Sequence, residues 1–233
     1  MTVKLNISEI FFSLQGEGPR LGQPVIFVRL SGCNLRCKWG KNKCDTPYTS
    51  WEPETNFYSI EEVLSLVALY RNKTSRVVLT GGEPTIHPGI NELVVQLVRE
   101  GYRLDLETNG TGPISELFDL VVCSPKLSDS APQGDRHFES HNVIRRKLHP
   151  DVIGADDRIF LKFVVGVETD LEEIQALVKS LNCPAERVYL MSEGVSQSEM
   201  SLRGPAIADL ALGLGYNYSP RLHIELWGNK RGQ

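Results

Sequence analysis

The sequence lacks long apolar runs, extended basic blocks, internal repeats and low-complexity tracts. A helix needs about 20 apolar residues to cross a membrane, and no stretch of this chain meets that requirement. The opening residues MTVKLNISEI do not follow the basic-then-apolar pattern of a signal peptide, so we expect a cytoplasmic protein. The longest basic segment is GNKRG, whereas proteins that bind duplex nucleic acid normally carry a basic stripe. Neither a membrane nor a nucleic acid is an expected partner.

Cysteine is scarce, and its distribution is uneven. Three of the five cysteines fall within residues 33–44, and an odd number of cysteines is a poor basis for a disulfide framework. Such a group is typical of a metal or redox cluster in a reducing compartment. The other two, Cys123 and Cys183, stand alone, and we interpret them as small buried apolar side chains.

The remaining composition is that of a globular protein. The chain of 233 residues has 25 Lys and Arg against 29 Asp and Glu, a net charge of −4, and 41% of its residues are hydrophobic. A chain of this length buries roughly three quarters of its unfolded surface when it folds. No linker-like segment divides it, so we expect one domain over residues 1–233.

Short apolar runs alternate with segments of helical period, which is typical of an α/β fold with a mostly parallel sheet. Capping boxes at Ser59 with Glu62 and at Thr169 with Glu172 predict two helix starts. Gly101 predicts the end of the helix NELVVQLVRE. The expected strands are residues 6–14, 25–30, 76–80, 102–107, 120–123, 159–165, 188–191 and a terminal run around 223–226.

Two long segments without a sustained period, 32–57 and 125–157, follow the ends of expected strands. Long loops inside a compact domain are usually functional, and ligands bind at the carboxyl ends of parallel strands. We therefore expect both loops to share one site. His137 and His141 are four residues apart, as in some metal pairs, but we interpret them as polar residues of a charged loop.

Cys33, Cys37 and Cys44 lie close enough in sequence to converge on one ion or cluster. A structural zinc ion would need a fourth ligand, and no second cysteine pair is present. Three thiolates with an open position suit a [4Fe–4S] cluster whose unique iron binds a small molecule. Spacing alone leaves cluster, zinc and coincidence open.

The motif Gly81-Gly82-Glu83-Pro84 directly follows the expected strand VVLT, where its backbone can approach a ligand closely. Alone it is a turn. Together with the upstream cysteines it resembles the radical S-adenosylmethionine superfamily, in which three cysteines hold the cluster and the GGEP strand binds the methionine amine of the cofactor.

The resemblance narrows to the 7-carboxy-7-deazaguanine synthase family of queuosine biosynthesis. It rests on FFSLQGEGPRLGQPVIFVRLSGCNLRC, CDTPYT, LTGGEP, ETNGT, SPK and LHIELWGNKRG. It implies a partial (β/α) barrel and a carbon–nitrogen lyase that converts 6-carboxy-5,6,7,8-tetrahydropterin to 7-carboxy-7-deazaguanine with loss of ammonia. The implied cofactors are one [4Fe–4S] cluster, S-adenosylmethionine and Mg²⁺. The implied partners are the pterin, a flavodoxin-like reductant and a second copy in a homodimer.

Position by position, the resemblance also implies a set of site residues. Arg29 can form a bidentate pair with the substrate carboxylate, and Gln15 offers donors and acceptors to a pterin edge. The expected substrate residues are Leu14, Gln15, Gly16, Arg29, Thr80 and His223. The expected S-adenosylmethionine residues are Gly82, Glu107, Ser124, Pro125, Lys126, Met191, Ser192, Glu193 and Gly194.

Cys33, Cys37 and Cys44 would ligate the cluster and Thr46 would bind Mg²⁺. Asp45 is an equally hard oxygen donor, so the choice of Thr46 rests on the resemblance. Glu17 receives no role, and no residue is assigned as an acid or base for the loss of ammonia.

One feature departs from the superfamily pattern. The usual third cysteine follows the second after two residues, with an aromatic residue before it near the adenine, whereas six residues separate Cys37 from Cys44 here and Lys43 precedes Cys44. The motif CDTPYT identifies Cys44 as the third ligand. We hypothesise that a bulge at residues 40–43 lets Trp39 fold back toward the adenine.

Two other functions are weighed against this one. A glycyl-radical activase would use a protein substrate and would need neither LQGEG nor Arg29. A zinc-stabilised binding module would have no catalysis and would bind one tight zinc ion.

Overall fold

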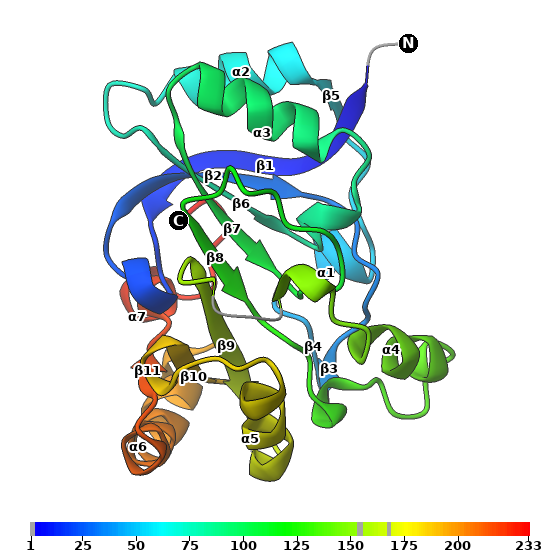
Figure 1. Cartoon of the computed structure of the whole chain (residues 1–233), viewed down its shortest axis with the longest axis vertical. Coiled ribbons are helices and arrows are strands. Elements are labelled where there is room, and N and C mark those ends of the chain that lie inside the picture. The colour runs from blue at the N-terminus through cyan, green and yellow to red at the C-terminus, as the bar shows by residue number, and fades with distance from the viewer. Residues whose placement is uncertain (1–2, 153–155, 167–168) are drawn as a thin grey trace.

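The computed structural model describes residues 3–152, 156–166 and 169–233 (Figure 1). Its main feature is a nine-stranded sheet with the order β11-β10-β9-β8-β7-β6-β2-β1-β5. The strands of this sheet are β1 Lys4–Leu14, β2 Pro24–Leu30, β5 Phe57–Ser59, β6 Arg76–Gly81, β7 Arg103–Thr108, β8 Leu120–Cys123, β9 Ile159–Val165, β10 Val188–Ser192 and β11 Asn217–Ser219. A separate hairpin pairs β3 Lys38–Trp39 with β4 Asn42–Lys43.

The order and direction of the strands account for the curvature of the sheet and for the position of the helices. From β2 through β6 to β11 each strand pairs in parallel with its predecessor in the sheet, while β1 and β5 add antiparallel strands at one edge. Right-handed crossovers between sequential parallel neighbours place the helices on one face, and the twisted sheet curls away from them. The chain therefore forms the α/β fold with a partial barrel that the resemblance implies.

The helices cover the outer face of this curved sheet. In Figure 1, α2 and α3 lie at the top and α5 and α6 at the bottom. The helices are α1 Pro47–Ser50, α2 Ile60–Ala68, α3 Ile90–Arg99, α4 Phe138–Arg145, α5 Leu171–Ser180, α6 Gln197–Leu214 and α7 Leu222–Trp227. No helix in the described ranges is both long and apolar enough to cross a membrane.

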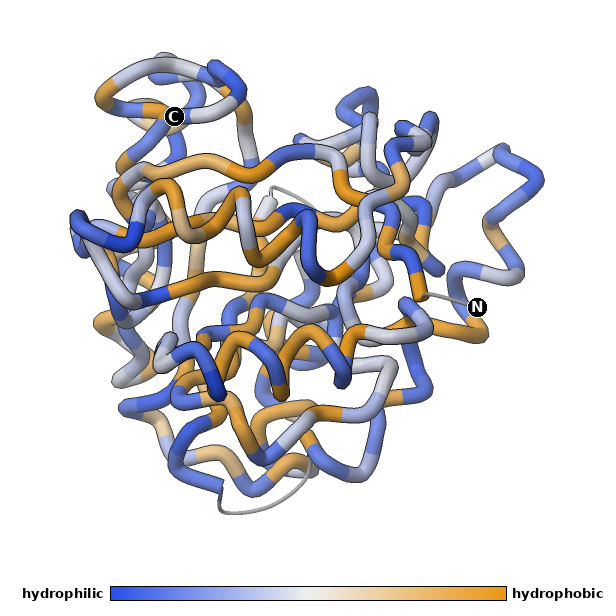
Figure 2. The backbone as a smooth tube through the Cα atoms, turned by 90° about the horizontal axis from the view of Figure 1, so that it is seen from above, coloured by the Kyte–Doolittle hydropathy of each residue, from blue (hydrophilic) through white to orange (hydrophobic). Residues whose placement is uncertain are grey.

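The period-2 alternation of each strand separates two environments. On β2, Ile26, Val28 and Leu30 join the large core beneath the helices. The alternate residues Phe27 and Arg29 face inward, and Phe27 packs in a small inner core with Phe11, Val25 and Val78. Figure 2 shows the apolar positions following the strands and the helix faces packed on them. The same alternation brings Thr80, Glu107 and Lys162 to the inner face.

Two helix ends agree with the sequence and one differs. The Ser59–Glu62 capping box is formed, and Gly101, with φ of 78°, follows the end of α3. Helix α5 begins one residue later than expected, because the carboxylate of Asp170 accepts from the N–H groups of Glu172 and Glu173. The Thr169 hydroxyl instead donates to Asp129.

The expected terminal strand at 223–226 is wrong. That run forms helix α7, and the edge of the sheet is occupied by the short strand β11, which pairs with β10. The alternation in LHIEL imitates a strand, but only Ile224 of α7 is buried, while Leu226 and Trp227 stay exposed.

Candidate active site

A cavity of about 450 Å³ opens at the carboxyl ends of the inner strand faces. Its walls come from the loop after β1, the cysteine loop (residues 32–57), strands β6 to β10 and the C-terminal segment. Of the expected site residues, Pro125 and Ser192 are buried outside its wall. The others line it: Leu14, Gln15, Gly16, Arg29, Cys33, Cys37, Cys44, Thr46, Thr80, Gly82, Glu107, Ser124, Lys126, Met191, Glu193, Gly194 and His223.

The β3–β4 hairpin absorbs the enlarged spacing between Cys37 and Cys44. Lys38 pairs with Lys43 across the hairpin, and Gly40 adopts a φ of 54° in its turn. The hairpin returns the chain to its starting point, where the N–H of Cys44 donates to the carbonyl of Cys37 at 3.0 Å. The inserted residues therefore lengthen the loop without moving Cys44 away from Cys37.

Hydrogen bonds from other elements hold the cysteine loop in place. Asn34 donates to the hydroxyl of Thr111 at 2.8 Å and accepts from the Asn109 amide at 2.9 Å. The indole N–H of Trp51 donates to the carbonyl of Cys37 at 3.0 Å. The loop is thus fixed by the segment that follows β7 and by its own later half.

His141 is part of this support, so its interpretation as a charged-loop residue is wrong. It lies in α4, is 1% exposed, and its Nδ1 accepts from the N–H of Arg36 at 3.2 Å. Its Nε2 lies 3.1 Å from the Ser130 hydroxyl, which donates to Leu127. Burial, together with the cations Arg145 and Lys126, lowers the pKa of His141 to about 4, so the ring is neutral at pH 7.

The three thiols fit a cluster better than a single ion. Burial raises the pKa of Cys33 to about 12 and raises the pKa values of Cys37 and Cys44, so without a bound metal these sulfurs are neutral thiols. Among the described residues, no three His, Cys, Asp or Glu side chains gather closely enough to hold a single metal ion. A four-iron cluster binds each of three thiolates through a different iron.

The Gly-Gly turn after β6 lets the cysteine loop cross directly over the strand end. A Cβ at Gly82 would lie 2.1 Å from the carbonyl oxygen of Gly32, so only glycine fits there. Next to it, the fully buried Glu83 carboxylate accepts from the Thr108 hydroxyl at 2.7 Å and from the N–H of Asn109 at 2.6 Å. This contact joins the ends of β6 and β7.

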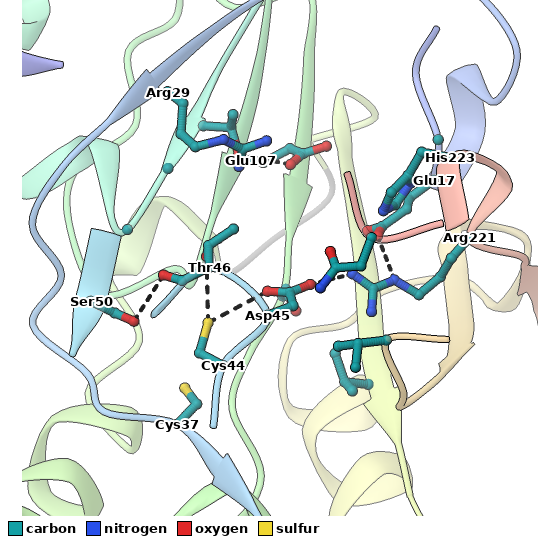
Figure 3. Close-up of a pocket in the computed structure, with 18 of the residues that line it drawn as sticks. Glu17, Arg29, Cys37, Cys44, Asp45, Thr46, Ser50, Glu107, Arg221 and His223 are labelled. Atoms are coloured by element: carbon teal, nitrogen blue, oxygen red, sulfur yellow. Dashed lines mark hydrogen bonds and ion pairs between the residues drawn. The ribbon is translucent and has the colours of Figure 1, made fainter. Parts of the chain in front are cut away.

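Glu107 lies among the expected substrate residues. Its carboxylate accepts from the Gln15 amide at 3.0 Å and from the Thr80 hydroxyl at 2.9 Å. Figure 3 shows Glu107 and Arg29 on the same wall, away from the cysteines. The geometry thus associates Glu107 with the substrate set rather than with the Ser124–Lys126 segment expected for S-adenosylmethionine.

Glu17, Lys162 and Arg221 form a buried ionic network in the cavity wall. Figure 3 shows Glu17 and Arg221 across the cavity from Arg29. Glu17 lies 2.5 Å from Lys162 Nζ and 3.0 Å from Arg221 Nε, and Arg221 also pairs with Asp45. Burial would raise the pKa of Glu17, but the two cations outweigh it and hold that pKa far below its usual range. Arg221 likewise outweighs burial at Asp45 and lowers the pKa of that carboxylate.

Sequence reasoning missed Lys162 and Arg221. The available signal was a single lysine inside the apolar strand IFLKFVV, because a charge buried in a sheet needs a partner. Glu17 in LQGEG was noticed without a role. The partner of Lys162 comes from a loop 145 residues away, so the pairing itself could not be read from the sequence.

His223 reaches the cavity from α7. A Cβ on Gly16 would lie 2.2 Å from its Nδ1, so the glycine allows the ring to pack against the loop after β1. The N–H of Leu222 donates to the carbonyl of Gly16 at 2.9 Å and fixes the same contact. Burial lowers the pKa of His223, and neighbouring Glu17 only partly offsets this.

Asp45 and Thr46 differ in what they can offer a cation. The Asp45 carboxylate is engaged by Arg221, whereas the Thr46 hydroxyl lies 3.5 Å from the Cys44 sulfur at the cavity wall. The carbonyl of Thr46, directly before α1, accepts from the hydroxyls of Thr49 and Ser50 in that helix. Thr46 therefore offers a cation in the cavity a neutral hydroxyl oxygen, and the hydrogen bonds to its carbonyl hold its backbone in place.

The chain is similar to several known proteins. The family model of the radical SAM superfamily matches residues 27–124. The 7-carboxy-7-deazaguanine synthase of Rhodopirellula baltica is 40% identical over 98% of this chain and 88% of its own length. The synthase of Halobacterium salinarum is 39% identical over 97% and 91%, and that of Pyrobaculum aerophilum 35% over 100% and 99%. The crystal structure of QueE from Escherichia coli shares the fold, with a TM-score of 0.64 and 24% identity over 94% of this chain and 95% of that chain.

Proposed function

Because the chain belongs to the 7-carboxy-7-deazaguanine synthases of the radical SAM superfamily, we propose that its cavity converts 6-carboxy-5,6,7,8-tetrahydropterin to 7-carboxy-7-deazaguanine and ammonia. The protein is a radical SAM enzyme whose product serves queuosine biosynthesis. We class the reaction as carbon–nitrogen lysis, since ammonia leaves the ring.

One observation carries the proposal: a single cavity has three thiols on one wall and Arg29 on another. Arg29 Nε is held by Glu9 at 2.7 Å, and no hydrogen bond joins its terminal nitrogens to any residue in the described ranges. Those nitrogens can take the pterin carboxylate in a bidentate pair. Gln15, Thr80 and Glu107 supply the donors and acceptors for the ring edge.

The cofactors supply the radical chemistry and the chain supplies its placement. A [4Fe–4S] cluster on Cys33, Cys37 and Cys44, with S-adenosylmethionine, would supply the radical that removes a hydrogen atom from the substrate. Arg29, with Gln15, Thr80 and Glu107, would orient the pterin toward the wall that carries the three cysteines. The inner strand faces and the C-terminal segment line the cavity in which that radical would form.

Mg²⁺ is proposed at Thr46. A magnesium ion keeps most of its coordination sphere for water and substrate oxygens, so one hydroxyl at the cavity wall is a sufficient protein contact. The engagement of Asp45 by Arg221 supports Thr46 as the ligand. We propose in addition, from the family resemblance, a homodimer that receives electrons from a flavodoxin-like protein.

Anaerobic turnover tests the proposed function. Protein reconstituted with iron and sulfide is given reductant, S-adenosylmethionine, Mg²⁺ and 6-carboxytetrahydropterin, and the product is identified by mass. We expect 7-carboxy-7-deazaguanine from the wild type and none from Cys44→Ala. If 5′-deoxyadenosine accumulates without deazaguanine, the substrate assignment is wrong, as a glycyl-radical activase would predict. Colourless protein with one tight zinc ion would contradict the radical chemistry as well.

A further inference from the structure

Strand β1 contains a β-bulge at Ser8. Ile7 pairs with Leu30 and Glu9 pairs with Arg29, so two steps along β1 match one step along β2. A bulge inserts one residue and reverses the face on which later side chains lie. Leu5 and Ile7 belong to the core beneath the helices, and after the bulge the partly buried Ile10 and Phe12 pack against that core.

The bulge therefore turns Glu9 toward the cavity. Without it, Glu9 would share the face of Ile7 and its charge would enter the apolar core. With it, Glu9 lines the cavity together with Phe11, directly opposite Arg29 on the neighbouring strand. Bulges beside active sites often aim a particular side chain, and here that side chain is a carboxylate.

Glu9 holds groups from three other elements. Its Oε1 accepts from Arg29 Nε at 2.7 Å and from the hydroxyl of Tyr48, in α1, at 3.2 Å. Its Oε2 lies 3.6 Å from Arg231 Nε in the C-terminal segment. The side chains of Glu9 and Arg29 are only 15% and 18% exposed, so solvent screens this contact weakly.

These contacts fix the plane of the Arg29 guanidinium. Nε is taken by Glu9, and the Cζ atom lies 5.8 Å from the centre of the Phe11 ring. The two terminal nitrogens are left for a ligand in the cavity. A carboxylate binds both nitrogens of such a fork only when the fork is held in the matching plane.

We propose that Glu9 is a positioning residue that orients Arg29 for the carboxylate on the pterin and thereby sets the preference for a carboxylated substrate. This inference rests on the proposed function. Because Glu9 orders the long arginine side chain when the protein folds, that ordering does not have to occur on substrate binding. Glu9 itself need not touch the substrate.

The test compares two ligands without turnover. Anaerobic protein loaded with cluster, S-adenosylmethionine and Mg²⁺, but given no reductant, is titrated with 6-carboxytetrahydropterin and with tetrahydropterin lacking the carboxylate. The variants are Glu9→Ala, Glu9→Gln, Arg29→Ala and the double variant Glu9→Ala with Arg29→Ala. Glu54→Gln is the matched control, because Glu54 binds Arg231 and Ser8 but not Arg29.

We expect Glu9→Ala to weaken binding of the carboxylated pterin by about tenfold or more and to leave the other pterin unaffected. Unchanged binding of the second pterin also demonstrates that the variant is folded. Glu9→Gln, which keeps an acceptor oxygen, should retain much of the preference, and the double variant should lose no more than Arg29→Ala. An unchanged preference in Glu9→Ala, or equal weakening for both pterins, would overturn the role of Glu9. A wild type without any preference would instead overturn the role of Arg29 in the proposed function.

Discussion

The backbone N–H of Cys44 donates to the carbonyl of Cys37, although six residues separate the two in sequence. The β3–β4 hairpin makes this possible, since its paired strands bring the chain back to its starting point. The enlarged spacing is thus a local addition to the cysteine loop. It keeps the backbone of Cys44 next to that of Cys37, as the proposed ligation of one cluster by both residues requires.

Replacing Cys44 tests this arrangement. Cys44→Ala should lose most of the bound iron and the visible absorbance after anaerobic reconstitution, because two thiolates hold a four-iron cluster poorly. The measurement is iron and sulfide per chain. Cys183→Ala is the control, since Cys183 packs against the large core beneath the helices and does not line the cavity. Equal iron in wild type and Cys44→Ala would show that Cys44 is not a ligand.

The hairpin also places Trp39 in the cavity wall. Asn42, which pairs with Trp39, donates to the carboxylate of Glu193 at 3.0 Å, and Glu193 is one of the expected S-adenosylmethionine residues. Trp39→Ala should weaken S-adenosylmethionine binding by about tenfold, the scale of one lost base–aromatic contact. Equilibrium titration measures this, with exposed Trp227→Ala as the control. If Trp39→Ala binds S-adenosylmethionine as tightly as the wild type does, Trp39 does not contribute to adenine binding.

His141 predicts a specific loss of stability in acid. Its pKa falls from 6.5 to about 4 on folding, through burial and the cations Arg145 and Lys126, so between these values the unfolded chain binds more protons than the folded one. Its neighbours Arg36 and Ser130 provide no compensating negative charge. This stabilisation is complete above about pH 6.5 and is lost as the pH falls toward 4, by up to about 3 kcal/mol.

Urea unfolding between pH 4.5 and 7.5 measures this loss. His141→Gln should be less stable than wild type at pH 7 and should depend less on pH over this interval. The same slope in wild type and His141→Gln would contradict a buried neutral histidine beneath the cysteine loop.

Because Lys162 and Glu17 form a buried ion pair, we expect a single substitution to destabilise the protein more than the double substitution does. Lys162→Met leaves the Glu17 carboxylate buried with Arg221 as its remaining partner, and we expect a loss of about 3 kcal/mol in the free energy of unfolding. Adding Glu17→Gln should recover part of that loss because it removes the excess negative charge and leaves Arg221 paired with Asp45. Denaturant unfolding provides the values, with Arg103→Met, which breaks a surface pair with Asp119, as a control expected within about 1 kcal/mol. Additive losses in the double variant would argue against a coupled pair.

The sequence predicted those parts of the molecule that depend on local pattern. Short apolar runs located the long strands, and the family motifs singled out Arg29 and Thr80, which the structure places on the face opposite the apolar core. Helix α7 was missed because LHIEL alternates like a strand, and only the presence of β11 beside β10 decides which segment completes the edge.

The missed site residues depend on contacts between distant segments. Lys162 meets Glu17 across 145 residues, and Glu9 faces the cavity only because of a bulge whose position depends on pairing with β2. His141 looked like a polar loop residue, yet its ring supports the backbone of Arg36 from 105 residues away. No local propensity encodes such partners, so the motifs identified the chemistry but not the residues that support it.

The stoichiometry of a single anaerobic reaction tests the central claim most directly. With the cluster reduced and Mg²⁺ present, the amounts of 7-carboxy-7-deazaguanine, ammonia, 5′-deoxyadenosine and remaining S-adenosylmethionine are measured together. Because the family resemblance implies that S-adenosylmethionine is used catalytically, we predict equal amounts of deazaguanine and ammonia, with many product molecules formed for each S-adenosylmethionine consumed. Deoxyadenosine formed in proportion to consumed cofactor, with no deazaguanine or ammonia from the pterin, would contradict it.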